Sequence, residues 1–219
     1  MSYNLFRKRR FTMAALPDRK YTVEEYIELF KNSDERFEYF DGEIVSMAAG
    51  KAAHEDIASN LIFNLRDKLK ERSCRIAGGG LAIKTVKAPP FRLADVSVVC
   101  GERIIEEMLG IEMLVNPLLI IEVLSPSTAE YDRDRKFIAY KSIESFREYL
   151  LVVQERAHVI QYVRQPNDKW LRDDIIGLES EVRLESVGIT LSLKDIYEMV
   201  VFPQPETGDP GSALVKLSG

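Results

Sequence analysis

Apolar residues recur at helical spacing in several stretches of the chain. Val23, Tyr26, Ile27 and Phe30 follow this period directly after Thr22, which forms a capping box with Glu25. The same spacing continues for much longer in the stretch that begins at His54. The pattern predicts four helices, over Val23–Lys31, His54–Arg72, Asp132–Ile143 and from the N-cap residue Ser192 to about Val200.

Runs of β-branched and aromatic residues predict strands between these helices. Asp41-Gly42 separates two such runs, Phe37–Phe40 and Glu43–Val45, and predicts a hairpin because both turn positions need positive φ. Leu118–Leu124 is apolar almost throughout, which is typical of a strand buried on both faces. Further strands are expected over Arg75–Val86 with a bend or bulge at Gly78–Gly80, Asp95–Cys100, Glu148–Gln154, His158–Arg164 and Val182–Leu184.

The order of these elements predicts one mixed α/β domain over residues 21–202, with a central sheet and helices against it. Residues 1–20 carry the basic run Arg7–Arg10 and do not share the pattern. We expect this segment to be disordered, the alternative being a basic arm that contacts phosphate; Met13 is a second candidate start. Residues 203–219 are rich in Pro, Gly and Ser and predict a flexible tail.

Composition narrows the class of protein. The chain has 219 residues, of which 46% are hydrophobic and 30% charged, a balance typical of soluble globular proteins. No apolar run approaches the roughly 18 residues of a membrane span. The net charge of −5 excludes a uniformly basic coat and predicts weak non-specific affinity for nucleic acid, without excluding a local basic groove.

The cysteines suggest a cellular setting. Cys74 and Cys100 are too few for a disulfide framework, and with two histidines in the chain they make a poor zinc site. The sequence therefore favours a reducing, cytoplasmic protein.

Two acids interrupt strands that are otherwise apolar. Asp95 lies in the run Leu93–Val99, and Glu122 lies in Leu118–Leu124. A buried carboxylate without a partner costs several kcal/mol, on the order of the penalty for burying any unpaired charge. Two such acids on neighbouring strands would suit one hard divalent cation, Mg²⁺ or Mn²⁺. The alternative is that each pairs with an Arg or Lys side chain, or lies in water at a strand end.

The predicted helix after Glu122 carries a polar face. Asp132, Lys136 and Tyr140 are spaced i, i+4 and i+8 and so share that face, and Lys136 could reach the two carboxylates. A lysine there would stabilise negative charge at a scissile phosphate. The alternative is a solvated ion pair between Asp132 and Lys136. Ser125 could contact phosphate, although a role in the turn before the helix is favoured.

Several segments together resemble a known family. The carriers are Arg36–Glu43, His54, Ala94–Val98, the string Ile121–Thr128, Asp132–Lys136 with Tyr140, and Arg147–Val152. From about Tyr21 to Val200 the chain resembles the Uma family of restriction-endonuclease-like proteins, abundant in cyanobacteria and belonging to the PD-(D/E)xK nuclease superfamily. The resemblance implies a restriction-endonuclease-like core, a central mixed β-sheet flanked by helices, with an N-terminal helix and β-hairpin.

The resemblance also implies roles for individual residues. Asp95 and Glu122 match the two acids that bind a divalent metal, and His54 matches a metal or active-site ligand. The superfamily lysine normally follows the second acid by two residues; here that position is Leu124, and Lys136 is the matching lysine, moved to the helix. Glu38 and Glu43 match the family's opening hairpin, where a structural role is at least as well supported.

The sequence as a whole favours a Mg²⁺- or Mn²⁺-dependent endonuclease that hydrolyses DNA as a homodimer, without membrane association. The rival is a catalytically inactive nuclease fold that binds nucleic acid or protein. A third possibility is that the polar residues form a purely structural ion-pair network. Outside this set, Gly78–Gly80 lacks the context of a phosphate loop, and His158 and Trp170 are expected to be structural.

Overall fold

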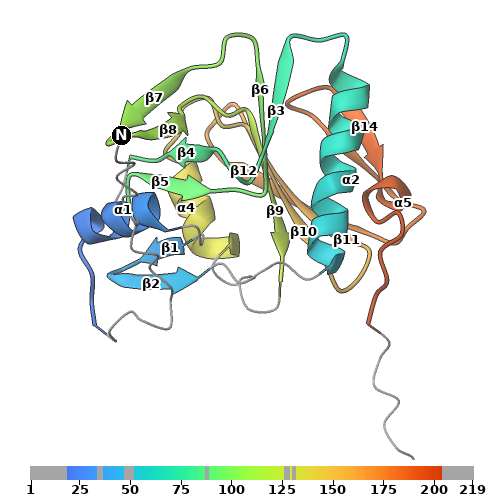
Figure 1. The fold of residues 1–219 in the computed structure, drawn as a ribbon. Coiled ribbons are helices and arrows are strands. Elements are labelled where there is room, and N and C mark those ends of the chain that lie inside the picture. Colours follow the sequence, from blue (N-terminus) through green and yellow to red (C-terminus); the bar gives the residue numbers. More distant parts are fainter. Residues whose placement is uncertain are drawn as a thin grey trace, which may run out of the picture.

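The computed structural model describes residues 19–33, 37–46, 52–86, 89–125, 129 and 132–203. A six-stranded sheet forms its centre, in the order β12-β11-β10-β9-β6-β3 (Figure 1). β9 and β10 are parallel, and the other neighbouring strands of this sheet are antiparallel. The six strands are β3 (Cys74–Gly78), β6 (Val96–Cys100), β9 (Leu119–Leu124), β10 (Glu148–Val153), β11 (His158–Arg164) and β12 (Trp170–Ile176). The predicted mixed α/β architecture is confirmed.

Different elements cover the two faces of this sheet (Figure 1). One face packs against α2 (Ala52–Leu69), α5 (Leu193–Ile196) and the hairpin of β13 (Glu181–Leu184) and β14 (Ile189–Ser192). The other face packs against the π-helical turn η2 (Asp132–Lys136) and α4 (Phe137–Tyr140). Leu119, Ile121 and Val123 of β9 belong to the first core, and Ile120 and Leu124 to the second. Since side chains alternate along a strand, Glu122 points toward α4.

A third core joins the N-terminal elements to a smaller sheet. Apolar side chains of α1 (Val23–Asn32) and of the hairpin β1 (Phe37–Phe40)–β2 (Glu43–Ser46) pack there. The small sheet has the order β5-β4-β8-β7, with β4 (Ala82–Lys84), β5 (Phe91–Leu93), β7 (Ile105–Met108) and β8 (Ile111–Leu114).

Both local signals at the N-terminal side are confirmed. Thr22 Oγ1 accepts a hydrogen bond from the Glu25 backbone N–H, and Glu25 reciprocates at the Thr22 N–H, so the capping box is complete. Asp41 and Gly42 have φ of 44° and 85°, as the predicted hairpin turn requires.

Three predicted elements differ from the observed ones. Arg75–Val86 is not one bent strand: the glycines end β3, the Leu81 N–H turns back to the Gly78 carbonyl, and β4 belongs to the other sheet. The expected helix over Asp132–Ile143 begins as a π-helical turn and ends at Tyr140. The last helix is also shorter than predicted, although Ser192 caps it through the Asp195 N–H.

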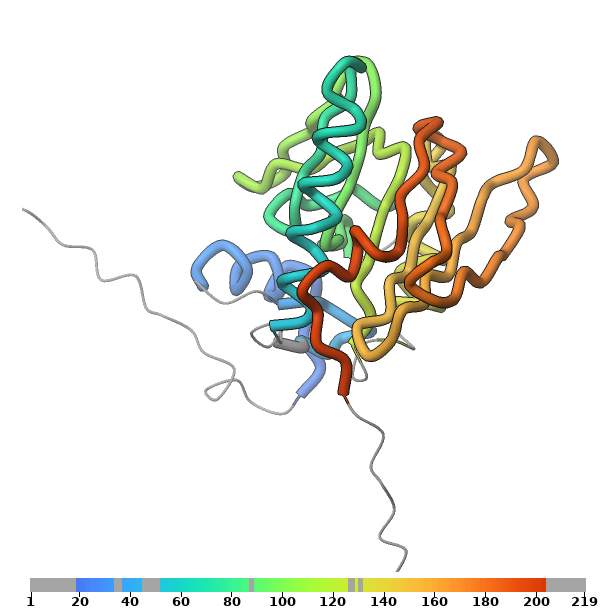
Figure 2. Tube along the Cα trace, turned by 90° about the vertical axis from the view of Figure 1, so that its right-hand side faces the viewer, coloured from blue at the N-terminus to red at the C-terminus, as the bar shows by residue number. Residues whose placement is uncertain are grey.

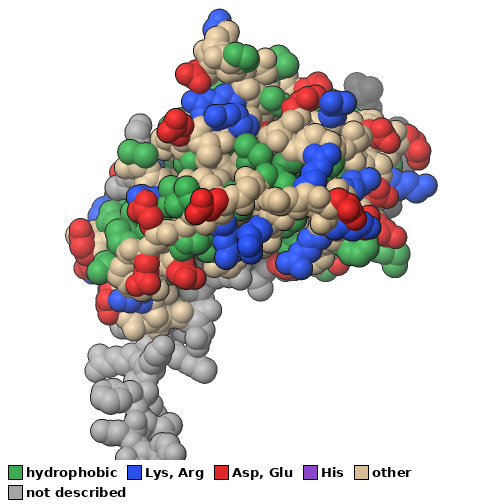
Figure 3. Space-filling view, turned by 90° about the horizontal axis from the view of Figure 1, so that it is seen from above, with side chains coloured by type: hydrophobic (Ala, Val, Ile, Leu, Met, Phe, Trp, Pro, Cys, Tyr) green, Lys and Arg blue, Asp and Glu red, His purple; other side chains and the backbone are tan. Residues whose placement is uncertain are grey.

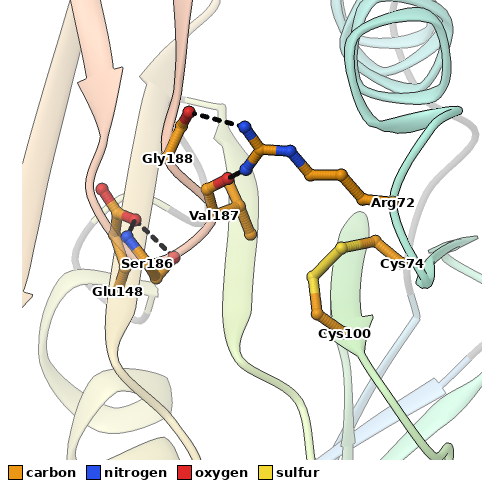
Figure 4. Close-up of a disulfide and its surroundings, with 7 residues drawn as sticks. All are labelled: Arg72, Cys74, Cys100, Glu148, Ser186, Val187 and Gly188. Atoms are coloured by element: carbon orange, nitrogen blue, oxygen red, sulfur yellow. Dashed lines mark hydrogen bonds between the residues drawn. A yellow bond between two sulfur atoms is a disulfide. The ribbon is translucent and has the colours of Figure 1, made fainter.

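The reading of the cysteines as reduced thiols is wrong in this structure. Cys74 and Cys100 are directly opposed in the antiparallel pair β3–β6, with their Cα atoms 4.0 Å apart, and form a disulfide (Figure 4). The two cysteines are 26 residues apart in the sequence, so their pairing depends on the strand register and could not be predicted from local pattern. Next to the bridge, Arg72 donates to the backbone carbonyls of Val187 and Gly188 in the β13–β14 turn.

The β11–β12 hairpin projects from the body of the molecule (Figure 2). The predicted N-terminal basic segment falls almost entirely outside the described residues, as does most of the predicted C-terminal tail. None of the helices in the described ranges combines the length and apolar character needed to cross a membrane.

Candidate active site

A buried lysine, Lys136, contacts three carboxylates that come from three different elements. The Nζ atom of Lys136 lies 3.1 Å from Glu38 Oε1 of β1, Glu122 Oε2 of β9 and Asp132 Oδ1 of η2. It also donates a hydrogen bond of 3.0 Å to the backbone carbonyl of Leu93. Because the residue is 3% exposed, these contacts replace the hydration of the ammonium group.

The helix after Glu122 supplies three members of this cluster, of which Tyr140 is the one not yet named. Asp132 and Lys136 open and close the π-helical turn, and Tyr140 follows one turn later in α4. The Tyr140 hydroxyl donates to Glu122 Oε1 at 3.0 Å, so each oxygen of that carboxylate has a partner. The predicted shared face of these three residues is thus present. Single π-helical turns are rare and occur frequently at functional sites.

Asp95 lies beside this cluster, just before β6. Its Oδ2 atom accepts hydrogen bonds from the Val123 N–H at 2.7 Å and from Nε2 of His54 at 3.2 Å. Val123 follows Glu122 in β9, and the charge of Asp95 helps to raise the pKa of Glu122, so the two acids lie near each other. The side chains of His54 and Asp95 remain 20% and 14% exposed, which makes this the solvent-reachable side of the cluster.

Electrostatics distinguish the two acids. Burial raises the pKa of Glu122 well above its usual range, and the carboxylates of Asp132, Asp95 and Glu38 add to this against the attraction of Lys136. Burial would also raise the pKa of Asp95, but the hydrogen bond and charge of His54, the charge of Lys136 and the Val123 N–H together outweigh it and lower that pKa. Of these two acids, Asp95 is therefore the one that stays ionised more readily.

The pKa values of Lys136 and His54 are raised, although burial alone would lower them. Desolvation lowers the pKa of Lys136, but the charges of Glu122, Glu38 and Asp132 more than compensate and raise it well above its usual range. The hydrogen bond to Asp95 raises the pKa of His54. Lys136 thus remains an ammonium ion inside the protein.

The cluster has more potential negative than positive charge. Its four carboxyl groups, from Glu38, Asp95, Glu122 and Asp132, face one ammonium and one imidazole. Hard oxygen donors with excess negative charge suit a divalent cation such as Mg²⁺ or Mn²⁺, so the donor chemistry fits one. Among the described residues, no group of three or more His, Cys, Asp or Glu side chains is already arranged around a common metal position.

The other predicted site residues divide between the cluster and the surface. Glu38 joins the cluster, whereas Glu43 of the same hairpin is 63% exposed and pairs with Lys20. The Ser125 carbonyl accepts from the Ala129 N–H, as expected of a turn residue. The sequence reading missed the Leu93 carbonyl and the Val123 N–H, because backbone groups leave no residue-type signal.

The fold of this chain is similar to that of a solved structure. A crystal structure from Anabaena variabilis ATCC 29413, titled "a putative nuclease belonging to DUF820", superposes with a TM-score of 0.65. The match covers 83% of this chain and 99% of that one at 20% sequence identity, which shows a shared restriction-endonuclease-like fold.

The family model Uma2, described as "Putative restriction endonuclease", matches residues 23–194. The chain belongs to this family. Two proteins of Synechocystis sp. (strain ATCC 27184 / PCC 6803 / Kazusa) are similar, both named as uncharacterized. The protein slr1290 is 32% identical over 85% of this chain and 96% of its own length. The protein sll1609 is 29% identical over 77% and 94% respectively. The resemblance drawn from the sequence is confirmed.

Proposed function

We propose that this protein is a metal-dependent endonuclease that hydrolyses phosphodiester bonds in DNA. The observation that carries the proposal is the convergence of Asp95, Glu122 and Lys136, three residues that are distant in sequence, at one acidic, partly accessible site. Membership of a nuclease-like family supports the reaction class.

Asp95 and Glu122 would hold the cation, Mg²⁺ or Mn²⁺, with His54 at its edge. When bound, such an ion polarises the phosphate and lowers the pKa of a bound water toward neutrality. Asp95 is suited to ligation because its lowered pKa keeps it ionised and the Val123 N–H fixes its orientation. His54 holds the carboxylate from the solvent side through its 3.2 Å contact.

Lys136 would stabilise the negative charge that develops on the scissile phosphate. Its charge is fixed by the surrounding acids, and its amine is already desolvated, so little reorganisation is needed during reaction. Glu38 and Asp132 orient the ammonium group. Tyr140 holds Glu122 through its hydroxyl, which fixes the plane of that carboxylate.

The biological unit and setting follow from the chemistry. Cutting both strands of a duplex requires two active sites, and two-fold symmetry is the commonest way to provide them, so we propose a homodimer. We propose a cytoplasmic location, where the nucleic acid is. In a reducing compartment the Cys74–Cys100 bridge would exchange with cellular thiols.

One observation favours a second candidate function. Lys136 and Tyr140 occupy both oxygens of Glu122, and the described residues present no ready-made trio of metal ligands. A catalytically inactive protein that keeps this fold to bind nucleic acid or protein, with the cluster as a structural ion-pair network, would show the same contacts.

Plasmid nicking with Mn²⁺ separates these functions. We expect supercoiled DNA to be nicked by the wild type, and nicking to be lost in Asp95→Asn, Glu122→Gln and Lys136→Met. Glu43→Gln makes the same carboxylate-to-amide change at an exposed position of the neighbouring hairpin and serves as the control. DNA binding without nicking by the wild type, at every metal concentration, would favour the inactive alternative.

A further inference from the structure

We propose that Arg135 is a phosphate-binding residue for the substrate and that Phe40 is the residue that positions it. This inference rests on the proposed nuclease function and names a contact to the nucleic-acid backbone beside the reacting centre. It comes from a contact between the β1–β2 hairpin and the π-helical turn η2.

The contact is a cation–π stack. The guanidinium carbon of Arg135 lies 3.6 Å from the centroid of the Phe40 ring. An arginine in this position is attracted by the negative face of the ring, and the contact restricts a side chain that would otherwise sample many rotamers. Arg135 is an exposed residue, so the ring fixes a cation at the surface.

The stack lies directly alongside the catalytic cluster. Phe40 is two residues beyond Glu38 in β1, and side chains two apart in a strand share one face. Arg135 immediately precedes Lys136 in η2. The hairpin and the helix are therefore joined twice, by the buried pair Glu38–Lys136 and by the exposed pair Phe40–Arg135. The second pair is the more exposed of the two.

The donors of Arg135 remain available for a ligand. Within the part of the chain that the structure describes, its guanidinium makes no hydrogen bond or ion pair, whereas four other arginines each pair with a carboxylate: Arg19, Arg164, Arg172 and Arg183. A guanidinium stacked by its face keeps its N–H groups free at the edge, in the fork that matches two phosphate oxygens.

The net negative charge of the chain makes a local cation near the cluster important for binding a phosphate backbone. The net charge is −5, and the face shown in Figure 3 mixes acidic with basic side chains rather than presenting one sign. A phosphate chain approaching the acidic cluster needs a positive contact at its edge. Arg135 supplies an exposed one, immediately before Lys136 in η2.

Salt-dependent DNA binding tests this role. Each phosphate contact contributes about 0.9 to the slope of log K against log[salt] for duplex DNA. Binding is measured with a fluorescent duplex, and Ca²⁺ replaces Mg²⁺ to suppress cleavage. Arg135→Ala should weaken binding and reduce the magnitude of that slope by about 0.9, the contribution of one phosphate contact. Arg183→Ala, which removes an exposed arginine paired with Glu185, is the matched control and should leave the slope unchanged.

Two further variants separate phosphate binding from structure. Arg135→Lys keeps the positive charge but loses the two parallel N–H donors of the guanidinium. Compared with Arg135→Ala, it should therefore recover the salt slope of the wild type more fully than its affinity. Phe40→Trp keeps an aromatic face and should bind like the wild type, whereas Phe40→Leu should weaken binding at unchanged thermal midpoint. In steady-state nicking, Arg135→Ala should raise KM far more than it lowers kcat.

The outcomes distinguish this inference from the proposed function. If the wild type binds and nicks DNA but Arg135→Ala retains its affinity and salt slope, Arg135 is not a phosphate contact and the nuclease proposal stands. An equal loss in Arg183→Ala would also overturn the inference, since only net charge would then matter. If the wild type neither binds nor nicks DNA, both proposals fail.

Discussion

Lys136 Nζ and Glu122 Oε2 lie 3.1 Å apart in an ion pair whose side chains are almost completely buried. The two residues come from the sheet and from the helix that follows it, and are separated by 14 positions. In the simplest nuclease motif a lysine would lie on the same strand as the acid. Here the lysine lies on the following helix and contacts the acid from there, and it also contacts Glu38 and Asp132.

Removing this lysine should destabilise the fold. Lys136→Met leaves three carboxyl groups buried around a position without a cation, and breaking a buried pair in this way typically costs about 3–5 kcal/mol. We expect the free energy of unfolding in urea to fall by that order at pH 7. Lys136→Met combined with Glu122→Gln should recover part of the loss. A single variant as stable as the wild type would contradict the buried network.

The Tyr140 hydroxyl should contribute more than an ordinary tyrosine hydroxyl. Tyr140→Phe removes a donor to the Glu122 carboxyl, and hydrogen bonds to charged groups contribute about 1.5–3 kcal/mol. Tyr149→Phe is the matched control, since that buried hydroxyl donates to the neutral backbone carbonyl of Asp132 and should cost only about 1 kcal/mol. Equal losses in urea denaturation would mean that Glu122 is protonated or differently oriented.

His54 should titrate above its usual value in metal-free buffer. The hydrogen bond to Asp95 raises the pKa of His54 from 6.5, and Asp95→Asn should return it toward that value in an NMR titration. The pair stabilises the fold between the lowered pKa of Asp95 and the raised pKa of His54. That contribution is lost as pH rises through the latter or falls through the former. A His54 pKa at or below 6.5 would contradict the contact.

Strong local signals predicted the elements around the site. The capping box fixed the start of α1, and Asp41-Gly42 fixed the β1–β2 turn. The β7–β8 hairpin was missed because its turn places Leu109, a residue without turn preference, at positive φ. β12 was missed because its exposed sequence, with Arg172, Asp173 and Asp174 together, shows no alternation.

Residue type predicted the members of the candidate site better than it predicted their geometry. Acids inside apolar strands and a lysine at helical spacing led us to expect Asp95, Glu122 and Lys136 close together, and the structure brings them together. That Glu38 belongs with them and Glu43 does not depends on which face of a short hairpin meets η2, which the sequence does not determine. The disulfide depends likewise on strand register rather than on local pattern.

Reduction of the disulfide should weaken the fold without abolishing it. The bridge closes a loop of 26 residues, for which a chain-entropy estimate gives about 3.5 kcal/mol. Cys74→Ser with Cys100→Ser should therefore lower the thermal midpoint, and dithiothreitol should lower that of the wild type by a similar amount. Dithiothreitol should leave the double variant unchanged. A wild-type midpoint indifferent to reductant would mean that the cysteines are not paired in solution.

Calorimetric titration of Mn²⁺ into the metal-free protein tests the central claim most directly, because it does not require the natural substrate to be known. We predict one site per chain in the wild type and in Glu43→Gln, lost in Asp95→Asn and in Glu122→Gln while all four proteins remain folded by circular dichroism. Absence of binding at millimolar Mn²⁺ in the folded wild type would contradict the account and leave the cluster as a structural ion-pair network.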